Sequence, residues 1–490
     1  MTLPTGLDPR TPVLIGAGIA HQRLDDPADA LEAAALMALA LDRAGADAGV
    51  DGLVDRVDEI IVAEGIWGYG DPGRSVLGGR SPGARTVLAA VGVLQQTMFT
   101  RACTQIASGS ADVVVVCGGE AKFRALRAAI TGTDAPETAA PGEVPDVRLA
   151  PEGEMITDVE IVRGLAVPAH QYAVMESAIR HDRGETPEAN RVALGDLMAA
   201  LSEVAAGNPD AWTRTPMTPD EVMAAPMVST PYTRACCSQW NVDQAAAFIL
   251  CPAGLAESLG VRPERWVVPH LGIESNLMVP LPERADLGRS PAIDVAGERL
   301  RAHGHDPAGI ELLEIYSCFP AAVRMQCEGL GIDPSRRLSV TGGMNFGGGP
   351  LNNFTLQALA RIVPMLRGAP DRSALVTSIS GMVTKFGLGL WSGRLPTAGF
   401  AAIDVSDEAR ARTGTVPVDA DYRGPATIAG YTVAHERGVP VVAVVIADAP
   451  TGARAVATGD DPDLIAALCD GDWCGRLVTV SAEMLVDVPR

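Results

Sequence analysis

A pattern of glycine turn, helix and buried strand occurs twice in this chain. Residues 92–97 read Gly-Val-Leu-Gln-Gln-Thr, and residues 349–354 read Gly-Pro-Leu-Asn-Asn-Phe; each opens a long apolar stretch. An apolar strand-like run and a second glycine turn follow in both copies. The only two lysines of the chain, Lys122 and Lys385, occupy matching places in the two copies, and each precedes a Phe. Such self-similarity predicts a duplicated structural unit.

The spacing of apolar residues predicts alternating strands and helices around these two copies. Expected strands are residues 11–20, 57–63, 112–117, 245–250, 266–271 and 310–316, and expected helices are 28–44, 92–107, 296–303 and 321–330. Alternation of this kind is typical of α/β proteins, in which helices cover mostly parallel sheets.

Two regions depart from the alternation. Residues from about 124 to 225 are first Pro-rich and acidic and then helical over 170–183 and 188–206, which predicts an insertion in the first half. Beyond residue 395, short β-rich runs at 424–433, 439–447, 453–458 and 475–480, with one helix at 461–468, predict a small OB-like β-barrel. The expected domains are therefore residues 1–255, 256–395 and 396–490.

Composition excludes some functions. The formal charge of −21 over 490 residues disfavours binding to nucleic acid or to anionic membrane surfaces. The nine cysteines show no metal-type spacing, so no metal site is expected and the thiols are interpreted as reduced. No apolar run is long enough for a membrane span, and the N-terminus does not resemble a signal peptide. We therefore expect a cytoplasmic protein.

Residues 8–395 resemble the thiolase superfamily. The resemblance rests on the two tandem halves, the long insertion and the glycine-rich turn, together with the run Ala-Asp-Val-Val-Val-Val-Cys-Gly-Gly-Glu at 111–120. Within the insertion, Tyr-Ala-Val-Met-Glu at 172–176, Arg-Gly-Glu-Thr at 183–186 and Asn-Pro-Asp-Ala at 208–211 resemble the sterol-carrier-protein-x branch. The resemblance implies a duplicated thiolase fold, with two βαβαβ halves in five αβαβα layers, and grouping with acetyl-CoA acetyltransferases of lipid metabolism.

The resemblance also implies that the catalytic side chains are missing. The nucleophilic cysteine of the family aligns with Gly92, and the catalytic histidine of its glycine-rich loop aligns with Gly349 within residues 342–350. The family's His or Asn at a third position is Tyr316, and residues 377–381 contain no thiol where a second catalytic cysteine is expected. Because these groups act as a unit, we expect no conventional thiolase activity. With the extra C-terminal region, this pattern resembles type 1 thiolase-like proteins of actinobacteria.

Several residues remain candidates for a site. Tyr316, Tyr232 and Lys385 are the candidates for catalytic roles, and each has a plain alternative as a packed core residue or, for Lys385, as an echo of the duplication. The candidates for substrate binding lie in or beside the mapped loops: Gly92, Asn345, Gly347, Gly348, Gly349 and Cys318. The glycines have packing as their plain alternative, and Cys318 has the role of a small buried hydrophobe.

Three functional hypotheses follow. The first is a binding or regulatory protein that takes acyl-CoA or a related lipid thioester without covalent chemistry and needs no cofactor. The second is a retro-aldolase acting on side-chain β-hydroxyacyl-CoA, with the C-terminal barrel as a fused partner domain. Nucleic-acid binding by the barrel comes last, because that region is acidic and has few aromatics. Thiolases of the family are dimers or tetramers, but the added domain favours a monomer over a homodimer.

Overall fold

The computed structural model describes residues 6–138, 143–396, 398–481 and 486–487. The first half is built on a six-stranded sheet in the order β1-β8-β4-β2-β3-β5. Its strands are β1 Pro12–Gln22, β8 Asp243–Pro252, β4 Val114–Ala121, β2 Glu59–Ala63, β3 Arg85–Ala89 and β5 Val147–Leu149. Strand β8 is antiparallel to both neighbours, and the pairs from β4 to β5 are parallel. The strand β5 comes from the inserted region and covers the edge of β3.

The second half is built on a five-stranded sheet in the order β10-β11-β12-β9-β13. Its strands are β10 Leu312–Glu314, β11 Ser373–Ser380, β12 Met382–Ser392, β9 Val268–Ser275 and β13 Ala401–Asp404. Strand β13 lies beyond residue 395 and pairs in parallel with β9. The edge strand of the second sheet therefore comes from the region that was expected to form a separate barrel.

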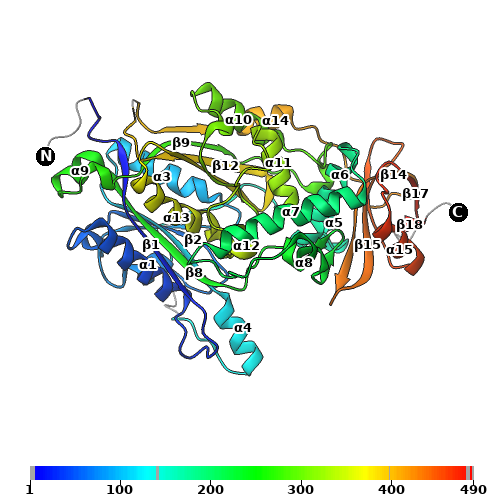
Figure 1. Ribbon diagram of the computed structural model, residues 1–490, viewed down its shortest axis with the longest axis horizontal. Helices are drawn as coiled ribbons and strands as arrows, with labels where there is room; N and C mark the ends of the chain where they lie inside the picture. The colour runs from blue at the N-terminus through cyan, green and yellow to red at the C-terminus, as the bar shows by residue number, and fades with distance from the viewer. Residues whose placement is uncertain (1–5, 139–142, 397, 482–485, 488–490) are drawn as a thin grey trace.

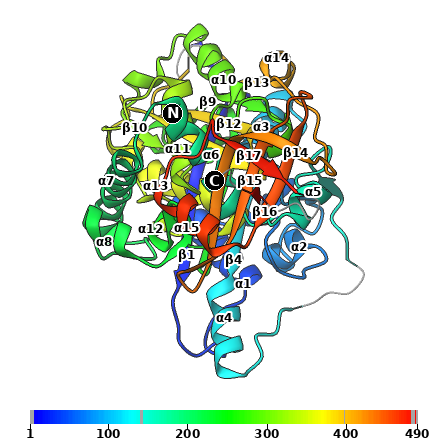
Figure 2. The ribbon, with the colours of Figure 1, turned by 90° about the vertical axis from the view of Figure 1, so that its right-hand side faces the viewer.

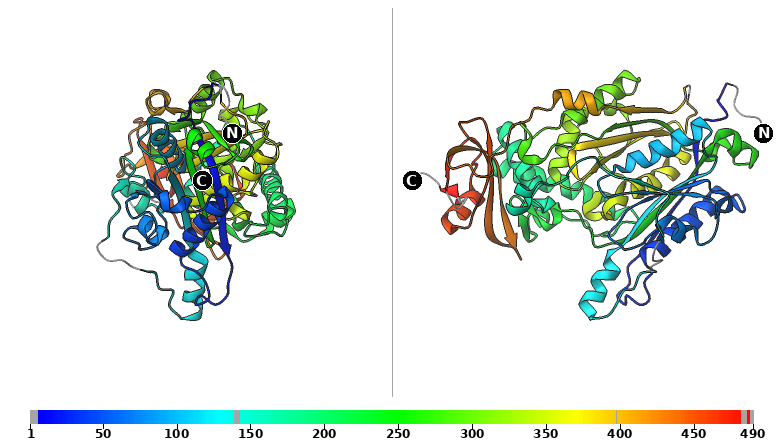
Figure 3. Two further views of the ribbon diagram at one scale, coloured as in Figure 1. Left: turned by 90° about the vertical axis from the view of Figure 1, so that its left-hand side faces the viewer. Right: turned by 180° about the vertical axis from the view of Figure 1, so that it is seen from behind.

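The two sheets and their helices form five layers (Figure 3). Helices α3 Gln95–Ser108 and α13 Phe354–Gly368, one from each copy of the repeat, lie between the sheets. They contribute Phe99 and Leu359 to a core that also contains Phe248 from the first sheet and Trp391 from the second. Helix α1 Ala33–Ala48 covers the outer face of the first sheet and α10 Pro291–Ala302 that of the second. The layered α/β architecture expected from the sequence is confirmed.

The remaining helices surround these layers. Helices α2 Pro72–Leu77, α4 Lys122–Thr131 and α9 Ala253–Ser258 belong to the first half, and α11 Pro320–Leu330 and α12 Gly343–Phe346 to the second. The inserted region contributes α5 Asp158–Val162, α6 Pro168–Asp182, α7 Pro187–Ala206 and α8 Pro219–Ala224. Helix α1 begins five residues later than expected, at Ala33, because Glu32 is its extended N-cap residue and the segment before it contains Pro27.

The C-terminal region forms an open antiparallel sheet (Figure 2). Its order is β16-β15-β14-β17-β18, with β16 Arg454–Gly459, β15 Val439–Asp448, β14 Gly424–Glu436, β17 Leu477–Val480 and β18 Val486–Asp487. The short strand β6 Met227–Ser229 of the inserted region pairs with β14 and with β7 Tyr232–Thr233. Helices α14 Ser406–Arg412 and α15 Pro462–Asp470 complete the region.

The expected OB-like barrel is not found, because no strand pair among the described residues closes this sheet. Both faces of the sheet are covered instead. Val445 of β15 packs with Leu464 of α15, whereas the neighbouring Val444 and Ile446 join the core that contains α6 and α11. A sheet buried on both faces explains the continuous apolar run of β15. The C-terminal sheet is therefore an outer layer attached to the inserted helices (Figure 1).

Candidate functional site

The turn before α3 places Gly92 against the inserted region. Gly92 is buried and has a φ of +98°, a backbone conformation that disfavours any side chain. A Cβ at this position would lie 2.7 Å from Met155 Sδ and 2.9 Å from Pro151 Cγ. The space that a nucleophilic side chain would need is therefore occupied by the thioether of Met155.

The same methionine faces the turn between β11 and β12. Gly381 in this turn has a φ of +78°, and a Cβ there would lie 2.6 Å from Met155 Sδ. This turn ends the segment in which a second catalytic cysteine was expected. A single half-buried methionine thus fills the space between two turns, one from each half of the fold. No motif in the sequence singles out Met155, because it lies in an irregular segment before α5.

The glycine-rich loop 342–350 is held by a buried carboxylate. Glu314 at the end of β10 accepts hydrogen bonds from the amide nitrogens of Val340 and Thr341, each at 3.0 Å, and from the hydroxyls of Ser339 and Thr341. Burial raises the pKa of Glu314 to about 7. Ser339 Oγ in turn accepts the amide N–H groups of Gly342 and Gly343 at 2.8 and 3.0 Å. The hydrogen bonds of Glu314 and Ser339 therefore fix the conformation of the loop.

Three glycines of this loop pack against residues 238–244. A Cβ on Gly348, which has a φ of +109°, would lie 2.2 Å from Gln244 Oε1, and one on Gly349 would lie 2.5 Å from Ser238 Oγ. Gln244 Nε2 donates to the carbonyl of Gly347 at 3.0 Å, and the Gly349 amide donates to the Gln239 carbonyl at 2.8 Å. The position of the expected histidine is therefore closed by a hydrogen-bonded neighbouring loop.

Two amide side chains beside the loop are buried without partners. Asn345 and Asn353 are 7% and 1% exposed, and neither the nitrogen nor the oxygen of either side chain makes a hydrogen bond within the described ranges. The Asn353 side chain lies against β4, where a Cβ on Gly118 would be 2.8 Å from its Oδ1. Buried amides without partners are rare and mark places where a ligand or water can supply hydrogen bonds. Asn353 was not among the candidates predicted from the sequence.

Tyr316 and Cys318 lie together in the core. Burial raises the pKa of Tyr316 and raises the pKa of the Cys318 thiol to about 12, while the neighbouring Tyr172 opposes the shift at Cys318. The backbone amide of Tyr316 donates to Thr377 Oγ1 at 2.8 Å, and its ring meets Phe354 edge to face. Both groups remain protonated at neutral pH, so this cluster offers hydrogen-bond donors and no thiolate.

The contacts of Tyr232 are made with α6 and with the start of α11. Its fully buried hydroxyl donates to Glu176 Oε2 at 2.9 Å and accepts the amide of Ala321 at 3.1 Å. Its ring stacks on Phe319 with the centroids 5.9 Å apart. These contacts join α6 to the start of α11. Its hydroxyl is engaged in holding these two helices together.

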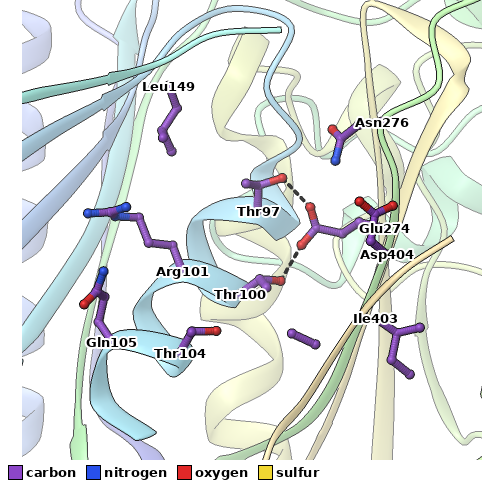
Figure 4. A pocket seen from close by; sticks show the side chains of 11 residues that line it. Thr97, Thr100, Arg101, Thr104, Gln105, Leu149, Glu274, Asn276, Ile403 and Asp404 are labelled. Carbon is purple, nitrogen blue, oxygen red and sulfur yellow. Dashed lines mark hydrogen bonds between the residues drawn. The ribbon is translucent and has the colours of Figure 1, made fainter. Parts of the chain in front are cut away.

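Lys385 lies in β12 beside a pocket between the two halves. Its ammonium donates to Asn276 Oδ1 at 3.3 Å, and burial lowers its pKa although the carboxylates of Glu274 and Glu152 oppose the shift. The Glu274 carboxylate accepts the hydroxyls of Thr97 and Thr100 on α3 (Figure 4). A pocket of about 400 Å³ is lined by Glu274, Thr97 and Thr100, and also by Asn276. Glu152 belongs to the same segment as Met155, so its effect on the pKa of Lys385 shows that this segment approaches β12.

The matching lysine of the first copy has a different role. Lys122 Nζ lies 3.6 Å from the ring centroid of Trp240, a cation–π contact at the start of α4. Within the described ranges, no group of three or more His, Cys, Asp or Glu side chains is arranged to hold a metal ion. Likewise, none of the helices described is long and apolar enough to cross a membrane.

The fold defines the class of protein. Two sheets with the paired helices α3 and α13 between them make up a thiolase fold. Neither Gly92 nor Gly381, the two turn residues that face Met155, carries a thiol, and Gly349 of the glycine-rich loop carries no imidazole. The human mitochondrial 3-ketoacyl-CoA thiolase, whose structure is known also in complex with CoA, has 16% identity and a TM-score of 0.56, covering 78% of this chain and 98% of that chain.

Further comparisons show which thiolase-fold proteins this chain resembles. A monomeric SCP2-thiolase-like protein type 1 from Mycobacterium smegmatis is 27% identical with a TM-score of 0.81, covering 98% of this chain and 99% of that chain. An Ltp2–ChsH2(DUF35) aldolase is 20% identical with a TM-score of 0.58, covering 79% and 99%. Residues 406–484 match the model of the thiolase-like protein type 1 additional C-terminal domain. The resemblance to type 1 thiolase-like proteins is therefore confirmed. A comparison with curated protein sequences found no match.

Proposed function

We propose that this protein binds acyl-CoA or a related lipid thioester and does not carry out thiolysis or Claisen condensation. The observation that carries the proposal is the position of Met155, whose thioether fills the space at Gly92 and at Gly381. Covalent acyl transfer needs a thiolate, a base and an oxyanion hole. At the Gly92 turn the thiolate is replaced by an apolar side chain.

The ligand class is supported by two buried side-chain amides, one in the glycine-rich loop and one just after it. The amide side chain of Asn345 is buried without a partner on the glycine-rich loop, and Asn353 is unpartnered beside β4. Each offers N–H donors to a thioester or pantetheine carbonyl and an oxygen to an amide N–H. The fold also supports this choice, since the structurally similar human thiolase is known with CoA.

Binding in this proposal requires Met155 to move. It lies in an irregular segment between β5 and α5, its side chain is half-buried, and Glu152, Gly153 and Glu154 beside it are exposed. An unbranched methionine side chain adapts to new surroundings at low cost. The segment then acts as a cover over the acyl site. We further propose that the protein acts as a monomer, because β5 occupies the edge of β3 and the similar protein from Mycobacterium smegmatis is monomeric. The cytoplasmic location is proposed from the sequence alone.

Calorimetric titration with acetyl-CoA, a long-chain acyl-CoA and free CoA, followed by mass spectrometry of the products, tests the proposal. We expect saturable binding of an acyl-CoA with no product. The variant Met155→Ala is expected to bind more tightly, whereas Met365→Ala, a half-buried methionine on α13, serves as the matched control. Absence of binding in both the wild type and Met155→Ala contradicts the proposal.

A second candidate is retro-aldol cleavage of a β-hydroxyacyl-CoA. The similarity in fold to the Ltp2–ChsH2(DUF35) aldolase favours it, together with the buried cluster of Tyr316, Cys318 and Tyr172. Because burial raises the pKa of Tyr316, its hydroxyl suits donation to a developing enolate oxygen better than proton abstraction. Release of aldehyde or ketone from a β-hydroxyacyl-CoA, lost in Tyr316→Phe, establishes this candidate.

A further inference from the structure

A second cavity lies between α7 of the inserted region and α11 of the second half. The two helices contact each other, and with the segment 332–338 they line a partly open cavity of about 650 Å³ (Figure 1 shows both helices). Neither the glycine turns nor Met155 lines this space, so it is separate from the acyl site proposed above. A volume of this size is within the range of pockets for small ligands.

The larger part of the wall of this cavity is apolar, and charged side chains line the rest of it. Positions at helical spacing on α7 present a face that is apolar except for Asp196, and residues of α11 and of the segment 332–338 supply the rest of the lining. The apolar lining comes mainly from Leu197, Leu201, Val204, Val323, Ile332 and Leu338. Protein interiors are close-packed and leave few voids of this size. An apolar space between two long helices is therefore suited to an apolar ligand.

The four arginines that line the cavity differ in whether they form ion pairs. Arg183 and Arg324 also line the cavity, and both form ion pairs with carboxylates. The adjacent Arg336 and Arg337 make no ion pair within the described ranges; Arg336 donates to backbone carbonyls, and the exposed Arg337 donates only to the Ser339 carbonyl, at 3.3 Å. The carboxylates of Glu185, Asp196 and Glu328 also line the cavity, so the four arginines leave its lining with one excess positive charge on a protein of net charge −21.

We propose that this cavity binds an amphipathic carboxylate, with its straight apolar chain between α7 and α11 and its anionic head at Arg336 and Arg337. The planar guanidinium group of Arg337 matches a carboxylate in a two-pronged geometry. The apolar walls bury the chain, which supplies the main driving force, and the arginines select the sign of the head group. This site does not depend on the acyl-CoA site.

Titration with dodecanoate, in parallel with dodecylamine, tests this inference. We expect saturable 1:1 binding of dodecanoate and at least tenfold weaker binding of the amine. Ala200 lines the cavity from an exposed position on α7, so Ala200→Trp fills the space and is expected to weaken dodecanoate binding at least tenfold. Val192→Trp, on an exposed position of the same helix outside the lining, is the matched control.

The head-group contact is tested separately. Arg337→Glu is expected to weaken dodecanoate binding several-fold and to improve binding of the amine, whereas Arg56→Glu, an exposed arginine outside the lining, leaves both unchanged. Thermal melts establish that each variant is folded. Absence of dodecanoate binding, or binding that Ala200→Trp and Arg337→Glu leave unchanged, overturns the inference. Neither result bears on acyl-CoA binding at Met155, which is measured with a different ligand and variant.

Discussion

Each copy of the repeated unit has a glycine where the family resemblance maps a catalytic side chain, and the space beside the two glycines is filled in different ways. At the first copy, the space at Gly92 is filled by the end of one half-buried methionine side chain and by Pro151. At the second copy, Gly348 and Gly349 contact the segment 238–244, which is tied to the loop by hydrogen bonds from Gln244 Nε2 and from the Gly349 amide.

The difference indicates which of the two glycine turns can open. Moving Met155 breaks no hydrogen bond of its side chain, because a thioether is at most a weak acceptor. Separating the glycine-rich loop from Gln244 and Gln239 leaves buried polar groups without partners, which costs about 1–3 kcal/mol for each group. We infer that the first copy retains a movable cover and that the second copy has become rigid support.

The largest effect is expected for Gly348→Ala in the rigid copy. The φ of +109° disfavours alanine, and its Cβ would lie 2.2 Å from the hydrogen-bonded Gln244 side chain. We expect a loss of about 2–4 kcal/mol in the free energy of unfolding, measured by urea denaturation. Gly83→Ala, where nothing lies within 4 Å of the new Cβ, is the control. A loss below about 1 kcal/mol contradicts the rigidity of this loop.

Glu314, whose carboxylate holds the glycine-rich loop, is expected to make the free energy of unfolding depend on pH. The folded-state pKa of Glu314 is raised to about 7, above its unfolded value, so the stability that it contributes is complete below the unfolded pKa and is lost as the pH rises through 7. Glu314→Gln is expected to remove about 2 kcal/mol of the difference in unfolding free energy between pH 5 and pH 8. The exposed Glu203→Gln is the control, and an unchanged pH profile for Glu314→Gln contradicts the expectation.

A cysteine placed in the movable copy measures how well Met155 covers it. In Gly92→Cys the new side chain packs against Met155, and a thermal melt establishes that the variant is folded, since the φ of +98° disfavours a side chain there. We expect slow modification of the thiol by a thiol reagent, measured by mass spectrometry of the peptide. In Gly92→Cys/Met155→Ala the rate is expected to rise at least tenfold, because the covering atoms are gone. The wild type reports labelling of the native cysteines, of which Cys237 and Cys469 are partly exposed. Equal rates in both variants contradict the idea of a cover.

The smallest effect on stability is expected for Met155→Ala. A half-buried side chain in an irregular segment contributes little to folding, so we expect a change below about 1 kcal/mol in urea denaturation. The loss in unfolding free energy is then smaller for Met155→Ala than for Gly348→Ala, although both substitutions lie at or next to glycine turns. A loss as large as that of Gly348→Ala means that Met155 is a structural core residue and removes the distinction between the copies.

The elements with regular apolar periodicity could be predicted from the sequence. The strands β1, β2, β4 and β8 and the helices α3, α6, α7 and α11 all lie close to their expected positions, because each buries one face, or both, against a neighbour. The C-terminal strands were also expected, but their closure into a barrel was not found. The sequence of each strand does not show whether the first and last strands of a sheet pair with each other. Here α6 and α15 cover the two faces of an open sheet.

The sequence by itself determined the duplication, the layered α/β fold and the glycines at the mapped catalytic positions, since these depend on local spacing and residue type. Only the tertiary structure decided what fills the space that those glycines leave. Met155 reaches Gly92 and Gly381 from an irregular segment, and Asn353 lies unpartnered against β4. The path of such a segment depends on long-range packing, which has no period in the sequence. The same packing determined that β5 and β13 became edge strands of the two sheets.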